Sequence, residues 1–278
     1  RHKVDGLVGG EQAQHFGVDL RILPGVEHLR PDDLDQVGRI ILRLLSKNLE
    51  THIFENADRS LKNMGLDYID LYYCHRFDPT TPMEETLRAL SALVDQGKIL
   101  YYGVSEEWGG ARIEKAQAII EKYGLHPLTV IQPQYNMMDR YIEHELMDIC
   151  EKNGIGITPF SPLAQGLLTG KYKKGQPYPE GSRATHQADK QVNALLTDEN
   201  LDKVEALSAI AAELGTNMSV LALAWILRKD CISSVITGAS KPSQLENNLA
   251  AAGFKIPADA LKEIEKILGF KPFSRHVG

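Results

Sequence analysis

The chain has 278 residues, 43% of them hydrophobic and 24% charged, which is typical of a globular protein with one large domain or two small ones. Its net charge of -6 argues against nucleic-acid binding, which needs clustered lysine and arginine side chains. No apolar run approaches the roughly 18 residues of a membrane-spanning helix and no signal-peptide pattern opens the chain, so we expect a cytoplasmic protein without membrane insertion.

From about residue 53, expected helices and strands alternate along the chain. Ile53, Ala57, Leu61 and Met64 recur at three- and four-residue spacing, which predicts a helix that ends at Gly65. The apolar run that follows, from residue 68 to residue 74, is too short and too aromatic for a helix. It therefore predicts the first strand.

The next helix has clear start signals. Thr81 is the expected N-cap, Pro82 suits the first turn, and Glu84 and Glu85 complement the helix dipole. Gly97 is the expected end of this helix, so a strand is followed by a helix.

The same unit then repeats. Further strands are expected at 99–105, 130–135, 154–160 and 233–237, and helices at 111–123, 141–152, 198–214, 217–228, 242–251 and 258–268. Strands and helices that alternate at intervals of roughly thirty residues predict βαβ units and a parallel sheet. The polar stretch 171–195 is too long for a simple connection, so we expect it to be a functional loop.

Two architectures have such a parallel sheet. A doubly wound sheet is expected to carry a glycine fingerprint after its first strand, and no G-x-G-x-x-G occurs here. This favours a (β/α)8 barrel, in which functional residues lie at the carboxyl ends of the strands.

Polar candidates follow several of these strands. His75 follows the first strand; a lone histidine is more often structural, but a neutral imidazole at a barrel mouth can donate a hydrogen bond to a substrate carbonyl. Ser105 and Glu106 follow the second. Three amides, Gln132, Gln134 and Asn136, accompany the third, and either recognise another amide, such as that of nicotinamide, or form a satisfied polar layer in the barrel.

The last two strand ends add an aromatic ring and cationic groups. Phe160 either packs in the core or stacks on a flat ring. The turn 238–240 leads into a helix with Lys241 beside it, which is a typical anion site. Together with Lys171 and Arg183, this lysine predicts binding of more than one phosphate.

The three cysteines, Cys74, Cys150 and Cys231, are odd in number and lack the spacing of metal ligands. We therefore expect no metal site and three small, buried thiols in a reducing compartment.

Taken in chain order, these motifs resemble the aldo-keto reductases, especially the branch that includes potassium-channel β subunits. The resemblance covers residues 53–275. It implies an α/β protein of the (β/α)8 TIM barrel type, with residues 1–278 forming a single domain that binds NADP(H), an anomalous segment 1–52, and first strands that are atypical or incomplete. The matching runs are 66–71, 81–85, 97–98, 161–166, 169–172, 238–240, 244–245 and 267–272.

The resemblance also implies roles for single residues. His75 takes the place of the family's active-site histidine. Glu106 stands where many relatives have Asn or Arg, and its contact is unassigned. Asn247 replaces a common Glu. The implied cofactor-binding residues are Ser105 and Gln132 at the nicotinamide carboxamide, Phe160 on its ring, Ser161, Leu163, Gln165, Gly166, Lys171, Ser182 and Arg183 at the pyrophosphate, and Gly238, Ser240, Gln244, Asn247 and Asn248 at the adenosine end.

Three further catalytic residues implied by the resemblance are not recognisable. Besides the histidine, the family uses a tyrosine as proton donor, with a lysine and an aspartate that lower its pKa, because an ordinary phenol is a poor acid at neutral pH. All three are expected upstream of residue 53. No tyrosine precedes Tyr68, and the only lysines there are Lys3 and Lys47.

Three readings of function remain open. The first is an NADPH-dependent oxidoreductase that reduces a small-molecule aldehyde or ketone to an alcohol, with an altered N-terminal part. The second is a non-catalytic NADP(H)-binding regulatory protein of the channel-β-subunit type. The third is a damaged chain with neither activity, because a barrel without its first strands has open edges. A sequencing frame error before about residue 50, the substrate and a homo-oligomeric state are also left open.

Overall fold

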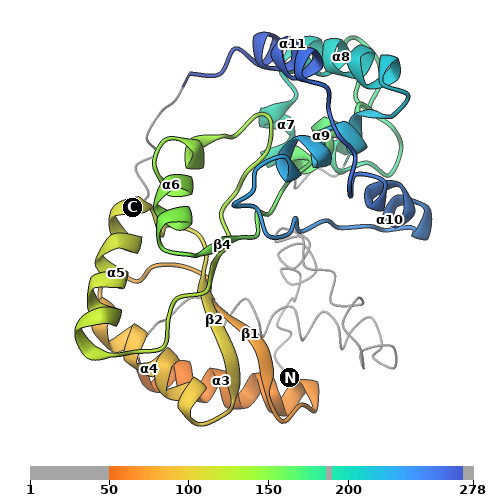
Figure 1. Ribbon diagram of the computed structural model, residues 1–278. Coiled ribbons are helices and arrows are strands. Elements are labelled where there is room, and N and C mark those ends of the chain that lie inside the picture. The colour runs from red at the N-terminus through yellow and green to blue at the C-terminus, as the bar shows by residue number, and fades with distance from the viewer. Residues whose placement is uncertain (1–49, 186–189, 272–278) are drawn as a thin grey trace, which may run out of the picture. The chain divides into compact units, whose positions relative to one another are not determined.

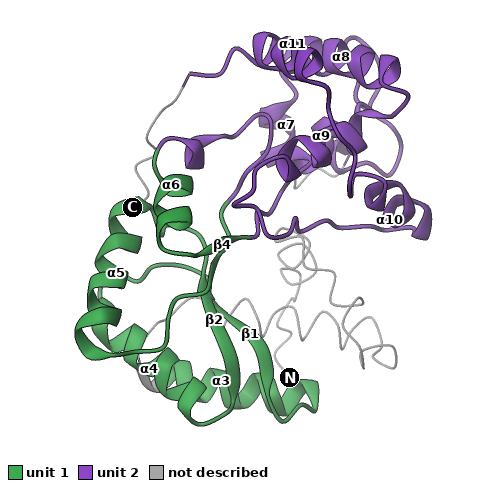
Figure 2. Ribbon diagram, viewed as in Figure 1, with its two compact units in different colours: residues 1–133, 145–157, 276–278 green, residues 134–144, 158–275 purple. Residues whose placement is uncertain are grey.

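The computed structural model describes residues 50–185 and 190–271 (Figure 1). These residues form two compact units, coloured separately in Figure 2. The first unit contains residues 50–133 and 145–157, and the second contains 134–144 together with 158–185 and 190–271. The expected single barrel domain stays a prediction.

A parallel sheet forms the centre of the first unit. Its strand order is β1 (Ile69–Cys74), β2 (Ile99–Val104), β3 (Val130–Ile131) and β4 (Gly156–Ile157). All neighbouring pairs are parallel, and the strands end in register: Cys74 lies opposite Val104, Val104 opposite Ile131 and Ile131 opposite Ile157. The predicted α/β class with a parallel sheet is therefore confirmed, and the carboxyl ends of the strands lie side by side.

Among the described residues of this unit, four helices accompany the sheet (Figure 1), and each packs against the next: α3 (Glu50–Met64), α4 (Met83–Asp95), α5 (Gly110–Tyr123) and α6 (Leu146–Lys152). Helix α4 also packs against β2, with Leu87, Leu90 and Leu93 fully buried, as their spacing predicts. Thr81 is not the N-cap that its position predicts. Pro82 occupies that place, and the Thr81 hydroxyl donates instead to Asp78, at 2.9 Å.

The second unit is mainly helical, and α9 is its most buried helix. Helix α9 contacts α8, α10 and η3, and residues 220–226 are all buried. Asn217 caps it, accepting a hydrogen bond from the Val220 N–H at 3.2 Å. The elements of this unit are η2 (Tyr141–Glu143), η3 (Ala164–Thr169), η4 (Arg183–Thr185), α7 (Lys190–Leu195), α8 (Asp198–Glu213), α9 (Met218–Leu227), α10 (Pro242–Leu249) and α11 (Ala258–Leu268).

Three expected strands are shorter than predicted or not formed. Strand β3 stops at Ile131 rather than continuing to residue 135, and β4 stops at Ile157 rather than at residue 160. Pro133 and Pro159 follow these ends, and proline has no N–H to donate to a ladder. Residues 233–237 form no strand; Ile236 N–H donates one bond to the Pro159 carbonyl, at 3.0 Å.

Two helical predictions also need correction. The helix expected at 141–152 is two elements, the short turn η2 and the helix α6, with Glu145 as the residue before α6. The loop expected at 171–195 is partly helical, since η4 and α7 lie within it. The remaining expected helices are confirmed to within a few residues.

Two further observations concern solvent and membrane exposure. Cys74 and Cys150 are buried and form no disulfide, as expected, whereas Cys231 is only half-buried. Within 50–185 and 190–271, no single helix has both the length and the apolar composition to cross a membrane; α8 and α9 meet that test only as a pair, and they are bent by 88°.

Candidate functional site

The parallel ladder brings three predicted residues together at the carboxyl ends of the strands. Strand β1 is directly followed by His75, β2 by Ser105 and β3 by Gln132. The Ser105 N–H donates to the Cys74 carbonyl at 3.0 Å, and the Gln132 N–H donates to the Val104 carbonyl at 2.8 Å. The Ser105 hydroxyl donates to the Gln132 carbonyl at 2.7 Å, so its oxygen is free to accept an N–H, such as that of a carboxamide.

His75 is uncharged at neutral pH. Its side chain is buried, with 7% exposed. Burial lowers the pKa of His75 to about 4, and the positive charge of Arg76 adds to this effect. A neutral imidazole donates one hydrogen bond and accepts one, which fits the expected role of orienting a carbonyl group.

None of the tyrosines with a perturbed pKa in the described ranges suits the role of proton donor. Burial raises the pKa of Tyr72, Tyr102 and Tyr135 above the ordinary value, which makes each a weaker acid. The predictions about the missing tyrosine, lysine and aspartate concern a segment that lies largely outside the described residues. No group of three or more potential metal ligands occurs within those residues.

The loops that follow β1 and β2 are tied together by contacts that the sequence analysis missed. Arg112 donates to the Glu107 carbonyl and lies over the Phe77 ring, 4.1 Å from its centroid. Phe77 meets Trp108 edge to face, with ring centroids 5.4 Å apart, and Arg76 forms an ion pair with Glu107 at 3.5 Å. Only the spacing of aromatic and cationic residues could have hinted at this cluster.

In the second unit, the turn after Phe160 has an uncommon backbone conformation. Ser161, Ala164 and Gln165 have φ values of 53°, 46° and 57°, and Gly166 has 97°. Non-glycine residues rarely adopt positive φ, and such residues cluster at functional sites. The turn is held by backbone bonds from the Ala164 N–H to the Ser161 carbonyl at 3.0 Å and from the Gly166 N–H to the Leu163 carbonyl at 2.9 Å.

Several predicted pyrophosphate residues are linked in this unit. Gln165 donates to the Ser161 hydroxyl at 3.0 Å and accepts from the Arg183 guanidinium. The amine of Lys171 lies 3.3 Å from the position that a β-carbon on Gly166 would take. Ser182 is buried, and its hydroxyl has no hydrogen-bond partner among the residues described. A buried hydroxyl without a partner is unfavourable, so this donor set fits phosphate oxygens.

The predicted adenosine end lies around α10. The Ser240 N–H and hydroxyl both donate to the Gln244 side-chain carbonyl, at 2.8 and 3.2 Å. The side-chain amide of Asn217, which sequence reasoning missed, donates to the side-chain oxygen of Asn247 at 2.6 Å. The Asn247 amide N–H2 group is therefore the end left for a ligand, whereas the glutamate common at this position offers only acceptors. Of the other predicted residues, Asn248 is buried, Phe160 is buried, Leu163 is half-buried and Gly238 is exposed.

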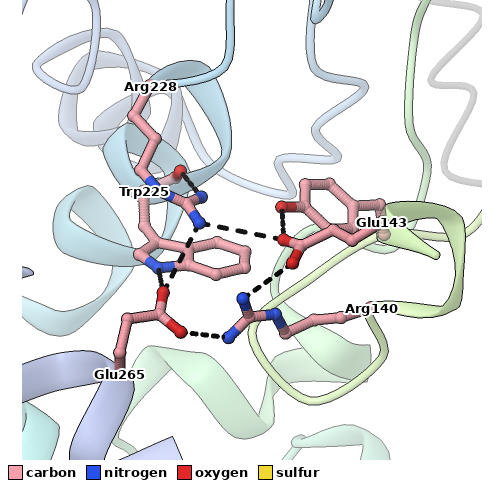
Figure 3. Close-up of polar contacts among 6 residues, drawn as sticks. Arg140, Glu143, Trp225, Arg228 and Glu265 are labelled. Carbon is pink, nitrogen blue, oxygen red and sulfur yellow. Dashed lines mark hydrogen bonds and ion pairs between the residues drawn. The ribbon is translucent and has the colours of Figure 1, made fainter. Parts of the chain in front are cut away.

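A partly buried ionic network in the second unit was also missed (Figure 3). Arg140 donates to Glu143 at 2.7 Å and to Glu265 at 2.6 Å, and Arg228 lies 3.7 and 3.5 Å from the same two carboxylates. Although burial opposes both charges, hydrogen bonds lower the pKa of Glu143 and raise that of Arg140. Arg140 and Glu265 are 125 residues apart in sequence, so no local sequence pattern could reveal this network.

Comparison of the sequence with known proteins finds a family match. A model of the Aldo/keto reductase family matches residues 44–269. A Schizosaccharomyces pombe protein is 43% identical over 227 residues, which are 80% of this chain and 65% of that protein; an Arabidopsis thaliana protein is 41% identical over 225 residues, 80% and 68%. Both are provisionally named as voltage-gated potassium channel subunit beta.

A bacterial enzyme is similarly close. The L-glyceraldehyde 3-phosphate reductase of Escherichia coli is 41% identical over 205 residues, which are 72% of this chain and 58% of the enzyme. The chain thus spans between 58% and 68% of the length of these three relatives.

Proposed function

Because the chain belongs to the aldo/keto reductase family, we propose that it is an NADPH-dependent oxidoreductase that reduces aldehydes or ketones to alcohols. The observation that carries this proposal is His75, buried and uncharged at the carboxyl end of β1. We extend the proposal to the fold: the four parallel strands are consecutive strands of a (β/α)8 barrel in a cytoplasmic protein.

The proposed cofactor is NADP(H), which supplies the hydride when it is bound. The Ser105 hydroxyl and the Gln132 side chain would hold the carboxamide. Lys171 and Arg183 would neutralise phosphate charge, and the Ser182 hydroxyl would gain the partner that it lacks. The Asn247 amide N–H2, which Asn217 leaves free, would donate to an acceptor at the adenosine end.

His75 would orient the substrate. Its uncharged ring can donate a hydrogen bond to a carbonyl oxygen without adding a buried charge. The Escherichia coli relative has L-glyceraldehyde 3-phosphate in its name, so the substrate class that we propose is a small aldehyde of this kind.

A second candidate function is regulatory. Two relatives are provisionally named as channel β subunits, and no tyrosine precedes Tyr68 in the chain to serve as the proton donor expected there. Under this proposal the chain binds NADP(H) and a partner protein but turns over no carbonyl substrate.

Kinetics with purified protein separate these proposals. We expect L-glyceraldehyde 3-phosphate to be reduced with loss of NADPH absorbance, and His75→Ala to lower kcat/KM about a hundredfold, the size expected for a lost polar contact in the transition state. His126→Ala is the matched control, since His126 pairs with Asp95 on the surface. Saturable NADPH binding without turnover supports the regulatory function, and absence of binding contradicts both.

A further inference from the structure

The segment that follows β3 is fixed to the Phe160–Ser161 pair by backbone contacts. Gln134 forms a parallel bridge with Phe160, and the Tyr135 N–H donates to the Phe160 carbonyl at 3.4 Å. Phe160 and Ser161 are two of the residues proposed to contact the cofactor. The segment 134–144 therefore determines where these two residues lie.

Asn136 makes the most specific contact of this segment. Its side-chain N–H2 donates to the Ser161 carbonyl at 3.0 Å. Its side-chain oxygen accepts from the backbone N–H groups of Met138 and Asp139, at 2.9 and 3.0 Å. Since a backbone N–H can only donate, these two bonds fix which end of the amide faces Ser161. The Asn136 side chain is buried, with 1% exposed, so water does not compete for these bonds.

The Ser161 carbonyl belongs to a strained peptide. Ser161 has a φ of 53°, a conformation that non-glycine residues adopt only when their surroundings enforce it. The same carbonyl accepts from the Ala164 N–H at 3.0 Å, so Asn136 supplies the second of its two hydrogen bonds. Loss of this bond would release the Ser161 backbone towards its ordinary conformations.

The segment is in turn anchored in the second unit by the ionic network of Figure 3. The Tyr135 hydroxyl donates to Glu143, whose other oxygen accepts from Arg140 at 2.7 Å. The Tyr135 ring is fully buried and lies 5.4 Å from the Trp225 ring, centroid to centroid. Asn136 therefore extends from a rigid support, which is what a residue that positions its neighbours requires.

From these contacts we propose that Asn136 is a positioning residue: it holds the Ser161 backbone, and with it the Ser161 hydroxyl and the Phe160 ring, in the geometry that NADP(H) requires. This inference rests on the proposed cofactor binding. It assigns a function to Asn136, one of the amides that follow β3, for which the resemblance implies no contact with the cofactor.

The test uses two probes and a matched pair of variants. Asn136→Ser retains an oxygen for the nearby N–H groups but cannot reach Ser161, and buries no charge. Asn153→Ser is the control, because Asn153 likewise donates through its amide to a backbone carbonyl, that of Ile149 at 2.7 Å, and contacts none of the proposed cofactor residues. The dissociation constants of NADPH and of adenosine 2′,5′-bisphosphate, which lacks the nicotinamide half, are measured for each.

We expect Asn136→Ser to raise the dissociation constant of NADPH about tenfold, as for one lost buried hydrogen bond, and to raise that of the bisphosphate by much less, because the bisphosphate keeps only one phosphate of the pyrophosphate and has no nicotinamide ring to meet Phe160. Asn153→Ser should change neither. An unchanged NADPH constant overturns the inference, as does an equal loss for both probes, which indicates general disruption. If the wild-type protein binds no NADPH at all, the proposed function fails as well. This result differs from one in which wild type and Asn136→Ser bind NADPH equally, which overturns the inference alone.

A measurement on the wild-type protein covers the case in which the variant does not fold. NADPH should slow amide hydrogen exchange in the peptide 134–144 together with 158–166, because Asn136 couples the two segments. Protection of 158–166 alone would overturn the inference. Asn136→Asp serves as the second variant: it keeps an oxygen for the Met138 and Asp139 N–H groups but has no N–H to donate to Ser161, so it should weaken NADPH as Asn136→Ser does, and an unchanged NADPH constant would overturn the inference.

Discussion

Burial of His75 sets both its protonation state and a pH dependence of stability. The folded state holds the pKa of His75 at about 4, whereas the ordinary value is 6.5. Between these values the unfolded chain binds a proton that the folded chain does not, so stability falls as pH drops from about 6.5 towards about 4 and is unaffected above this range.

Replacing the histidine should remove this component. We expect the free energy of unfolding of His75→Asn to fall less than that of the wild type between about pH 7 and about pH 5, because asparagine does not titrate. Urea unfolding of both proteins at the two pH values measures the difference. Equal losses for the two proteins would show that folding does not lower the pKa of His75.

We expect Lys241 to distinguish NADPH from NADH. It precedes α10 and forms no ion pair with any residue that the structure describes, so its charge is available to a ligand. Lys241→Ala should weaken NADPH about tenfold and NADH little, because only NADPH carries a 2′-phosphate.

Titration of the protein fluorescence with each cofactor measures this preference. Lys255→Ala, which removes an equal charge from an exposed lysine of the same unit, is the control. Equal weakening of both cofactors by Lys241→Ala would refute a contact with the 2′-phosphate.

At the level of elements, the sequence predicts most helices and the first two strands. The three-residue spacing of Leu87, Leu90 and Leu93 predicts a helix, and all three side chains are buried there. Strands β1 and β2 contain no proline, so every residue can donate its N–H to a strand ladder. The apolar runs predict longer strands at β3 and β4 than the structure contains, because Pro133 and Pro159 have no N–H to donate beyond the observed strand ends. Pairings of distant residues, such as Arg140 with Glu265, could not be predicted because no local period encodes them.

The ionic network should contribute strongly to the stability of the second unit. Glu143→Gln removes one of two carboxylates that neutralise Arg140 and Arg228, so it should lower the free energy of unfolding by about 3 kcal/mol. Glu246→Gln, at an exposed position of α10, is expected to change it by less than about 0.5 kcal/mol. Chemical denaturation measures both, and equal effects would show that the network is not a stabilising feature.

For the whole molecule, the order of motifs carries more information than any single one. His75, Gln132 and Ser161 are each ambiguous alone, and their order identified a family that the comparisons confirm over residues 44–269. The structure adds three features that motif order cannot show: a neutral histidine, a buried serine hydroxyl without a partner among the described residues, and a strained turn. The reaction itself stays a proposal, because the expected proton donor is not recognisable in the sequence.

Binding of NADPH by the purified chain tests the central claim most directly. Isothermal titration is predicted to show saturable binding at one site per chain, tighter than for NADH and weakened in Lys171→Ala and Lys241→Ala, because cationic side chains neutralise the phosphates. Absence of saturable binding, or equal affinity for NADPH and NADH in all three proteins, would contradict the account.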